Sequence, residues 1–101
     1  MILYNVTVNV EQAIEEEWLT WMRTEHMLDV LNTGMFATAK IFRLLGVEQS
    51  EGTVTYAVQY FAERMEQYER YLQEFAPNLQ QEVQQKFGTR TMSFRTLMEE
   101  V

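Results

Sequence analysis

Hydrophobic and polar residues alternate over Ile2–Val10, where every second residue is apolar. A period of two is typical of a strand that buries one face. Similar segments, bounded by turn residues, predict three more strands, at Met35–Leu45, Thr53–Phe61 and Thr89–Met98. The polar loop Gly46–Gly52 is short enough to join the second and third strands as a hairpin.

Two other segments show the three- and four-residue spacing of amphipathic helices. The first helix is expected to end at Gly34, which suits a left-handed cap. Its apolar positions are Ile14, Trp18, Trp21, Met22 and Leu28. The second pattern runs from Met65 to Val83 and is followed by Gly88. Because proline cannot donate the interior hydrogen bond, we expect a kink or a fresh helix start at Pro77.

The predicted order is β-α-β-β-α-β, in a single domain over residues 1–101. That order indicates an α+β, ferredoxin-like fold, in which a four-stranded antiparallel sheet carries two helices on one face. The first and third strands are then central, and the other two are edges. The distribution of charge agrees, because the basic strand residues all lie on the predicted edges, where charge discourages edge pairing: Lys40, Arg43, Arg90 and Arg95.

The two faces of the predicted sheet differ in polarity. The face under the helices is expected to hold Tyr4, Val6, Val8, Val54, Tyr56, Val58 and Tyr60. The opposite face, called the open face below, is expected to hold Leu3, Asn5, Thr7, Asn9, Thr53, Thr55, Ala57, Gln59 and Phe61, joined by Phe36, Thr38, Lys40 and Phe42 and by Thr91, Ser93, Arg95 and Leu97. A water-exposed face usually collects Lys and Glu, whereas most residues of this face are small and uncharged. We therefore favour a homodimer that covers the open face over a solvated face rich in β-favouring Thr.

Composition excludes several classes of function. The chain has no Cys, which excludes disulfides, a thiolate nucleophile and a zinc knuckle. Its net charge of −7 argues against nucleic acid and anionic membranes as partners. No apolar run approaches the roughly 20 residues of a membrane span. The strand pattern starts at Ile2 without a basic, apolar leader, so the cytoplasm is the expected location.

The layout, with the segments Trp18–Met22 and Gly34–Phe36 and with Glu25-His26 and Asp29 between them, resembles the dimeric α/β-barrel superfamily. More closely, the chain is similar to a small bacterial family within it that is known only as a domain of unknown function. Shorter matches lie at Tyr4–Val8, Tyr60–Phe61, Tyr68–Tyr71, Glu74–Pro77 and Phe94–Leu97.

The resemblance implies a homodimer whose two sheets form a shared barrel, and it implies no particular activity. The wider superfamily includes cofactor-independent quinol monooxygenases, haem-degrading enzymes and members without known chemistry. Its pockets lie between sheet and helices or inside the half-barrel. The catalytic residues differ between its families, so none is transferred to this chain.

His26 is the single histidine, and it has Glu25 and Asp29 nearby. On a helical wheel that starts at Ile14, Glu25 falls at about 20°, inside the apolar stripe, and His26 at about 120°, on its flank. Glu25 would then need a polar partner, unless the helix kinks near His26 and releases it to solvent. Asp29 is close enough in sequence to orient the imidazole, which suggests His26 as a catalytic base. The alternative is that these residues only form the polar end of a helix.

Neither a metal nor a cofactor is expected. The chain lacks an HExxH motif and paired Cys, and one His beside two carboxylates makes at most a sparse metal site. No phosphate-binding Gly loop or Ser-His-Asp motif appears. The polar residues predicted on the covered side suit a small polar or anionic ligand, and equally suit water-mediated contacts within a dimer: Asn5, Thr7, Asn9, Gln59, Lys40 and Arg95.

Two functions remain as hypotheses. The first is a soluble, homodimeric, non-enzymatic module or small-metabolite binder. The second is a cofactor-independent monooxygenase or isomerase acting on an aromatic or quinol-like molecule, with His26 as base, Asp29 orienting it, and Asn5, Gln59 or Arg95 holding oxyanion charge. A filled interior with His26 outside favours the module, and a pocket that reaches His26 favours the enzyme.

Overall fold

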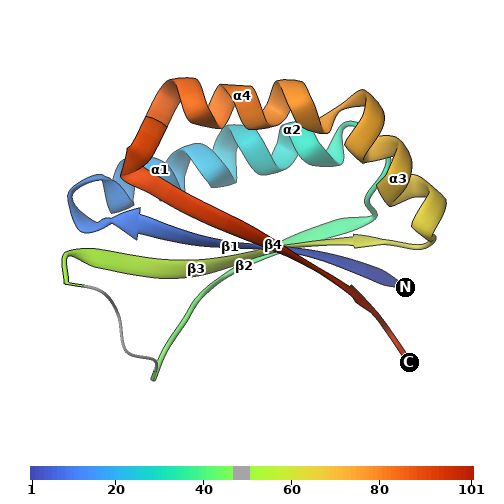
Figure 1. Ribbon diagram of the computed structural model, residues 1–101, viewed down its shortest axis with the longest axis horizontal. Coiled ribbons are helices and arrows are strands. Elements are labelled where there is room, and N and C mark those ends of the chain that lie inside the picture. The colour runs from blue at the N-terminus through green and yellow to red at the C-terminus, as the bar shows by residue number, and fades with distance from the viewer. Residues whose placement is uncertain (47–50) are drawn as a thin grey trace.

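The structure is a computed structural model that describes residues 1–46 and 51–101. Part of the predicted loop Gly46–Gly52 therefore lies outside the described residues. The elements follow the predicted order, with each predicted helix divided in two (Figure 1): β1 (Ile2–Glu11), α1 (Glu15–Trp21), α2 (Met27–Leu31), β2 (Thr38–Arg43), β3 (Thr53–Ala62), α3 (Met65–Glu74), α4 (Ala76–Phe87) and β4 (Thr91–Glu99).

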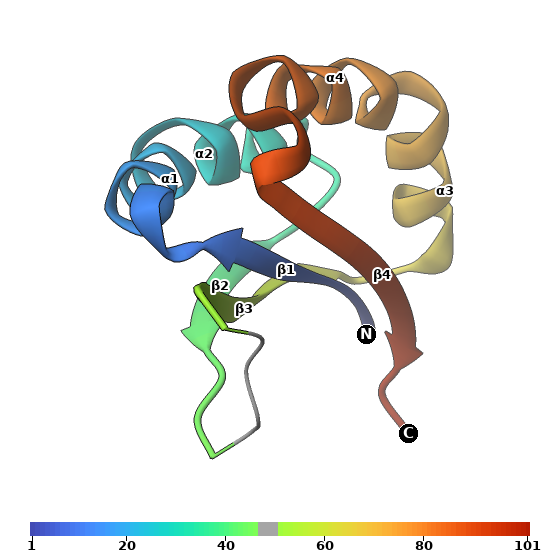
Figure 2. The same cartoon turned by 60° about the vertical axis from the view of Figure 1, so that its left-hand side comes forward.

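The four strands form one antiparallel sheet in the order β2-β3-β1-β4. All helices lie on one face of this sheet, and the opposite face carries none (Figures 1 and 2). The fold is therefore the ferredoxin-like α+β arrangement, and β1 and β3 are central as predicted. β2 is shorter than the predicted Met35–Leu45, because the chain enters the sheet only at Thr38.

A π-helical turn, Met22–His26, separates α1 from α2. The backbone N–H of Met27 donates to the carbonyl of Met22, five residues earlier, and the Thr24 hydroxyl donates to the Thr20 carbonyl at 2.8 Å. One extra residue in a helical turn rotates everything after it by about 100°. Glu25 is consequently exposed. Of the two alternatives drawn from the sequence, the helix is interrupted near His26 and Glu25 is released to solvent.

The second helical region ends at Phe75 and starts again with Pro77 in the first turn of α4. This is the predicted fresh start, because the first turn of a helix needs no donor from proline. α4 ends at Gly88, whose φ of 58° is costly for any residue with a Cβ. An ion pair between Arg70 and Glu74 is also present on α3.

The orientation of β4 differs from the prediction. Val6 pairs with Arg95 and Val8 with Ser93, so these polar residues of β4 share the helix-facing side of the sheet. Thr91 and Leu97 lie on the same side, and Met92, Phe94, Thr96 and Met98 lie on the open face instead. The sequence prediction reversed the two sides because it expected the apolar side of β4 to be buried. The helices leave β4 largely exposed, so hydrophobicity does not set its orientation there.

Phe36 was also predicted on the open face, and it lies in the core. It is 5% exposed, and its ring stacks on Tyr4 at 6.0 Å between centroids and meets Tyr71 edge-on at 4.9 Å. It precedes β2 rather than belonging to it, so strand alternation does not apply to it. The core otherwise holds the predicted helix-facing strand residues, together with Trp18, Met22, Val30 and Tyr71.

The open face is more apolar than the sequence suggested. Met92 is 71% exposed and Phe94 is 64% exposed, and Phe42 and Met98 are exposed as well. Figure 2 shows the C-terminal end of the chain and the end of β2 projecting on this side, away from the helices. The open face therefore carries exposed apolar side chains between two projecting segments.

Candidate functional site

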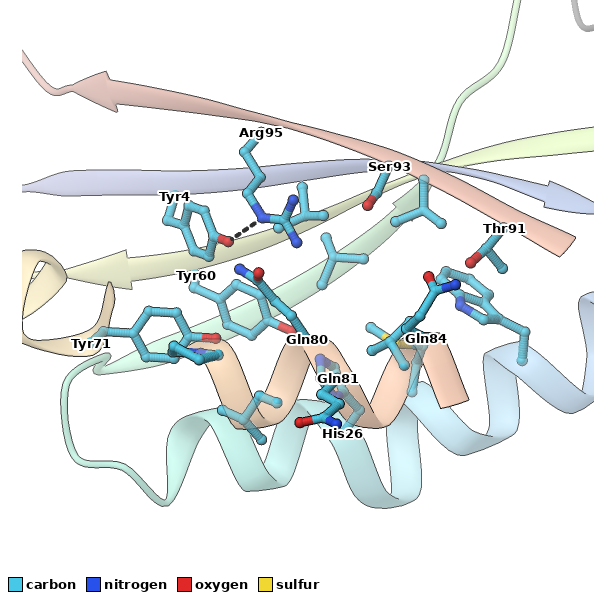
Figure 3. Close-up of a pocket in the computed structure, with 18 residues that line it drawn as sticks. Tyr4, His26, Tyr60, Tyr71, Gln80, Gln81, Gln84, Thr91, Ser93 and Arg95 are labelled. Carbon is cyan, nitrogen blue, oxygen red and sulfur yellow. Dashed lines mark hydrogen bonds between the residues drawn. The ribbon is translucent and has the colours of Figure 1, made fainter. Parts of the chain in front are cut away.

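A cavity of about 570 Å³ lies between α4 and the helix-facing side of the sheet (Figure 3). We call it the α4 cavity. β4 supplies one wall, α4 the other, and the central strands the floor. Its lining consists of Tyr4, Val6, Val8, Trp18, Met22, His26, Val58, Tyr60, Tyr71, Pro77, Leu79, Gln80, Gln81, Val83, Gln84, Thr91, Ser93 and Arg95.

The cavity exists because α4 does not close down onto β4. The inward side of β4 offers Thr91, Ser93 and Arg95, which cannot fill the gap with apolar volume. The facing side of α4 offers Gln80 and Gln84, one helical turn apart and both exposed. The mouth is therefore polar.

The interior of the α4 cavity is apolar. Trp18, Met22, Val58 and Tyr60 line it, and each is less than 5% exposed. A polar mouth above an apolar interior suits an amphipathic organic molecule.

His26 reaches the interior of this cavity from the π-helical turn. Its ring stacks on Trp21, with 4.9 Å between centroids. The Nδ1 atom is buried and has no hydrogen-bond partner in the part of the chain that the structure describes. Burial lowers the His26 pKa to about 4, although the negative charge of Asp29 acts in the opposite direction. At neutral pH the imidazole is uncharged and has one unused polar atom.

Asp29 does not orient the His26 ring. It is exposed, it does not line the α4 cavity, and the only effect on His26 is that of its charge at a distance. His26 therefore lines the α4 cavity without a hydrogen bond from Asp29, and Asp29 lies outside the cavity. Glu25 and Asp29 instead border a shallow depression on the outer side of the helices.

Arg95 extends from β4 into the space between the sheet and α4 (Figure 3). Its Nε donates to the Tyr4 hydroxyl at 2.8 Å. Burial raises the pKa of Tyr4, and the neighbouring guanidinium opposes this rise. The terminal NH₂ groups of Arg95 make no hydrogen bond or ion pair with residues 1–46 or 51–101.

Tyr60 and Tyr71 line the same end of the cavity, with their hydroxyl ends directed toward α4 (Figure 3). Burial raises the pKa of both phenols well above the ordinary value. Both therefore remain protonated at any physiological pH and can donate a hydrogen bond into the cavity.

The other predicted ligand-binding residues lie elsewhere. Asn5, Thr7, Gln59 and Lys40 are on the open face, separated from Arg95 by the thickness of the sheet. The Asn5 amide is buried and donates to the Thr7 hydroxyl at 3.0 Å. The Lys40 ammonium sits 5.9 Å from the Phe61 ring centroid. The structure thus groups these four together and places Arg95 with His26 instead.

The sequence reasoning missed the contribution of α4. Gln80 and Gln84 follow the helical spacing of Leu79 and Val83, and this shared face was a usable signal. Tyr71 was not among the predicted site residues either. Glutamine and tyrosine do not by themselves indicate a binding site. They become candidates only once the structure shows that they line a cavity.

Within residues 1–46 and 51–101, no group of three or more His, Asp or Glu residues is arranged to hold a metal ion. In the same described residues, no helix is both long enough and apolar enough to cross a membrane.

The chain matches a family and several known structures. A family model described as "Domain of unknown function (DUF4286)" matches residues 1–101. No curated protein matches the chain. An ethyl tert-butyl ether (EthD) family protein from Bacillus halodurans has a TM-score of 0.69 at 10% identity, with 100% of both chains covered.

Two designed proteins are similar as well. The de novo design Foldit4 has a TM-score of 0.59 at 12% identity, covering 99% of this chain and 98% of its own. A de novo design with a ferredoxin fold has a TM-score of 0.51 at 21% identity, covering 100% of this chain and 88% of its own. At such identities these similarities establish the fold alone.

Proposed function

We propose a function for this chain from the premise that it belongs to the family described as Domain of unknown function (DUF4286): it is a homodimeric module that binds a small organic molecule in the α4 cavity. Neither catalysis nor a cofactor is needed for this role. The proposal has two parts, the binding of a ligand and the formation of a dimer, and they occupy opposite faces of the sheet.

The α4 cavity supports the first part of the proposal, the binding of a ligand. Ligand sites are typically concave, mostly apolar spaces of about 300–1,000 Å³ with a few polar groups that fix orientation. The α4 cavity, at about 570 Å³, has an apolar interior and the polar groups of His26, Gln80 and Arg95. A structural core of this size is normally filled to high density, so an open space with polar groups is better explained by a ligand.

A thermal-shift screen tests this part, using quinols, haem and common metabolites. The matched control is Ser93→Phe, which places a large side chain at the mouth of the cavity. We expect at least one compound to raise the Tm of the wild-type protein and to leave the Tm of Ser93→Phe unchanged. If every compound has the same effect on both proteins, the cavity is not a ligand site.

The open face supports the second part. Contiguous apolar patches on soluble proteins usually mark an interaction surface. Across the four strands, from the level of Leu3 to that of Asn9, Lys40 is the only charged side chain on this face. The chain as a whole carries a net charge of −7. Two copies can therefore stack these faces with little repulsion, although their remaining surfaces are acidic.

Catalysis is the second candidate function, and one observation favours it, the presence of His26 inside the cavity. The proposed chemistry is cofactor-independent oxygenation or isomerisation, in which His26 accepts a proton from an acidic phenol or enol. A pKa of about 4 makes His26 a weak base at neutral pH, so binding is the better-supported role. Oxygen uptake with a quinol that is lost in His26→Gln would support catalysis, and equal uptake in both proteins would exclude His26 as the base.

A further inference from the structure

The α4 cavity has an unusual charge for this protein. Arg95 is the only cavity-lining residue in the described chain with a formal charge at neutral pH, and no Asp or Glu lines the cavity. The site is thus a local positive position in a chain of net charge −7. A cation would be repelled there, and a dianion would leave one charge without a partner.

Most hydrogen-bond donors at this end of the cavity have no partner among the described residues. Nε of Arg95 is engaged with Tyr4, while its terminal NH₂ groups have no partner among the described residues. Tyr60 and Tyr71 add phenolic hydroxyls that stay protonated. Guanidinium and phenol donors match the acceptor oxygens of a carboxylate or enolate. Arg95 itself is exposed, so an anion bound there keeps part of its hydration.

The remaining lining selects the body of the ligand. Val8, Val58 and Met22 give an apolar surface below the mouth, and Trp18 provides an aromatic face. His26 lies on the lining as well, and it is uncharged at neutral pH. An apolar or aromatic body fills this region.

We propose that the natural ligand is a compact organic monoanion, with its carboxylate or enolate on Arg95 and its apolar or aromatic body in the interior of the α4 cavity. This inference rests on the proposed binding function and adds the class of ligand. Arg95 is the residue that determines specificity for the anion, and Tyr4 positions it through the bond from Nε.

Isothermal titration calorimetry with two matched probes tests the inference. 2-Naphthoate and 2-naphthamide have nearly the same shape and differ in charge. At pH 7.5 we expect the wild-type protein to bind 2-naphthoate about tenfold more tightly or better, as a charge-assisted hydrogen bond predicts. In Arg95→Gln the two affinities should become equal, with the affinity for 2-naphthamide within about twofold of wild type.

Two further variants control for charge and folding. Arg90→Gln makes the same change in net charge at a residue that does not line the cavity, and it should keep the full preference for 2-naphthoate. Arg95→Lys retains the cation and should keep part of the preference, even if Arg95→Gln proves to be misfolded by circular dichroism.

The possible failures are distinguishable. Wild-type protein that binds 2-naphthamide as tightly as 2-naphthoate overturns the monoanion inference and leaves the binding function standing. An unchanged preference in folded Arg95→Gln also overturns it. Wild-type protein that binds neither probe also overturns the inference, and the proposed binding function then stands or falls with the thermal-shift screen.

Discussion

Acidification should destabilise this protein through His26. The pKa of His26 is lowered from 6.5 to about 4 because burial disfavours the imidazolium. As the pH falls below 6.5, the unfolded chain binds a proton that the folded chain does not accept until about pH 4. The contribution of neutral, buried His26 to the free energy of unfolding is therefore fully present above pH 6.5. It is lost progressively as the pH falls from 6.5 to 4.

The size of the effect follows from the difference in pKa. A difference of about 2.5 corresponds to about 3.4 kcal/mol in total, at 1.36 kcal/mol for each pKa unit. At pH 5.5, one unit below the unfolded value, the loss is about 1.4 kcal/mol. Measurement at pH 5.5 also stays above the isoelectric point near 4.6, where the protein would carry no net charge.

Urea unfolding followed by circular dichroism at pH 7.5 and 5.5 measures this loss, at one fixed protein concentration. The matched variant is His26→Gln, which keeps a polar side chain and removes the titration. The carboxylates titrate in both proteins and cancel in the comparison. We expect wild type to lose about 1.4 kcal/mol more than His26→Gln on going to pH 5.5. An equal loss in both proteins would refute the burial of His26 as a neutral base.

Three further predictions concern the rest of the molecule. Phe94→Glu places a carboxylate on the open face, and light scattering should show a monomer mass where the wild type shows a dimer; a monomeric wild type would contradict the dimer. Tyr56→Phe removes the hydroxyl that donates a hydrogen bond to Glu15 and accepts one from Arg43. Urea unfolding should show a free energy of unfolding lower by about 1 kcal/mol, and no loss would mean that these hydrogen bonds are no stronger than the bonds to water that they replace. Deletion of Thr24 removes the extra residue of the π-helical turn and should cost less than about 1 kcal/mol, whereas deletion of Glu69 from the regular helix α3 should cost several times more by rotating the buried Tyr71 that follows it; equal costs would argue against the π-helical turn.

The order of elements and the layout of the sheet could be predicted from the sequence because each depends on local pattern. Alternation identified the strands, and helical spacing identified the helices. Pro77 and Gly88 marked boundaries, because proline cannot donate an interior helical hydrogen bond and glycine readily adopts the positive φ found at the end of α4. The basic residues distinguished edge strands from central ones, because a charge is expensive in the middle of a covered sheet.

The site could not be predicted in this way, because tertiary packing decided it. The orientation of β4 depends on whether α4 covers it, and the strand pattern alone favoured burying Met92 and Phe94 rather than Arg95. The position of His26 depends on a single inserted residue in the helix, whose hydrogen bond from Met27 to Met22 has no local sequence signal. Residues far apart in the chain therefore meet in one cavity only after the helices have packed, since the space between α4 and β4 belongs to neither segment by itself.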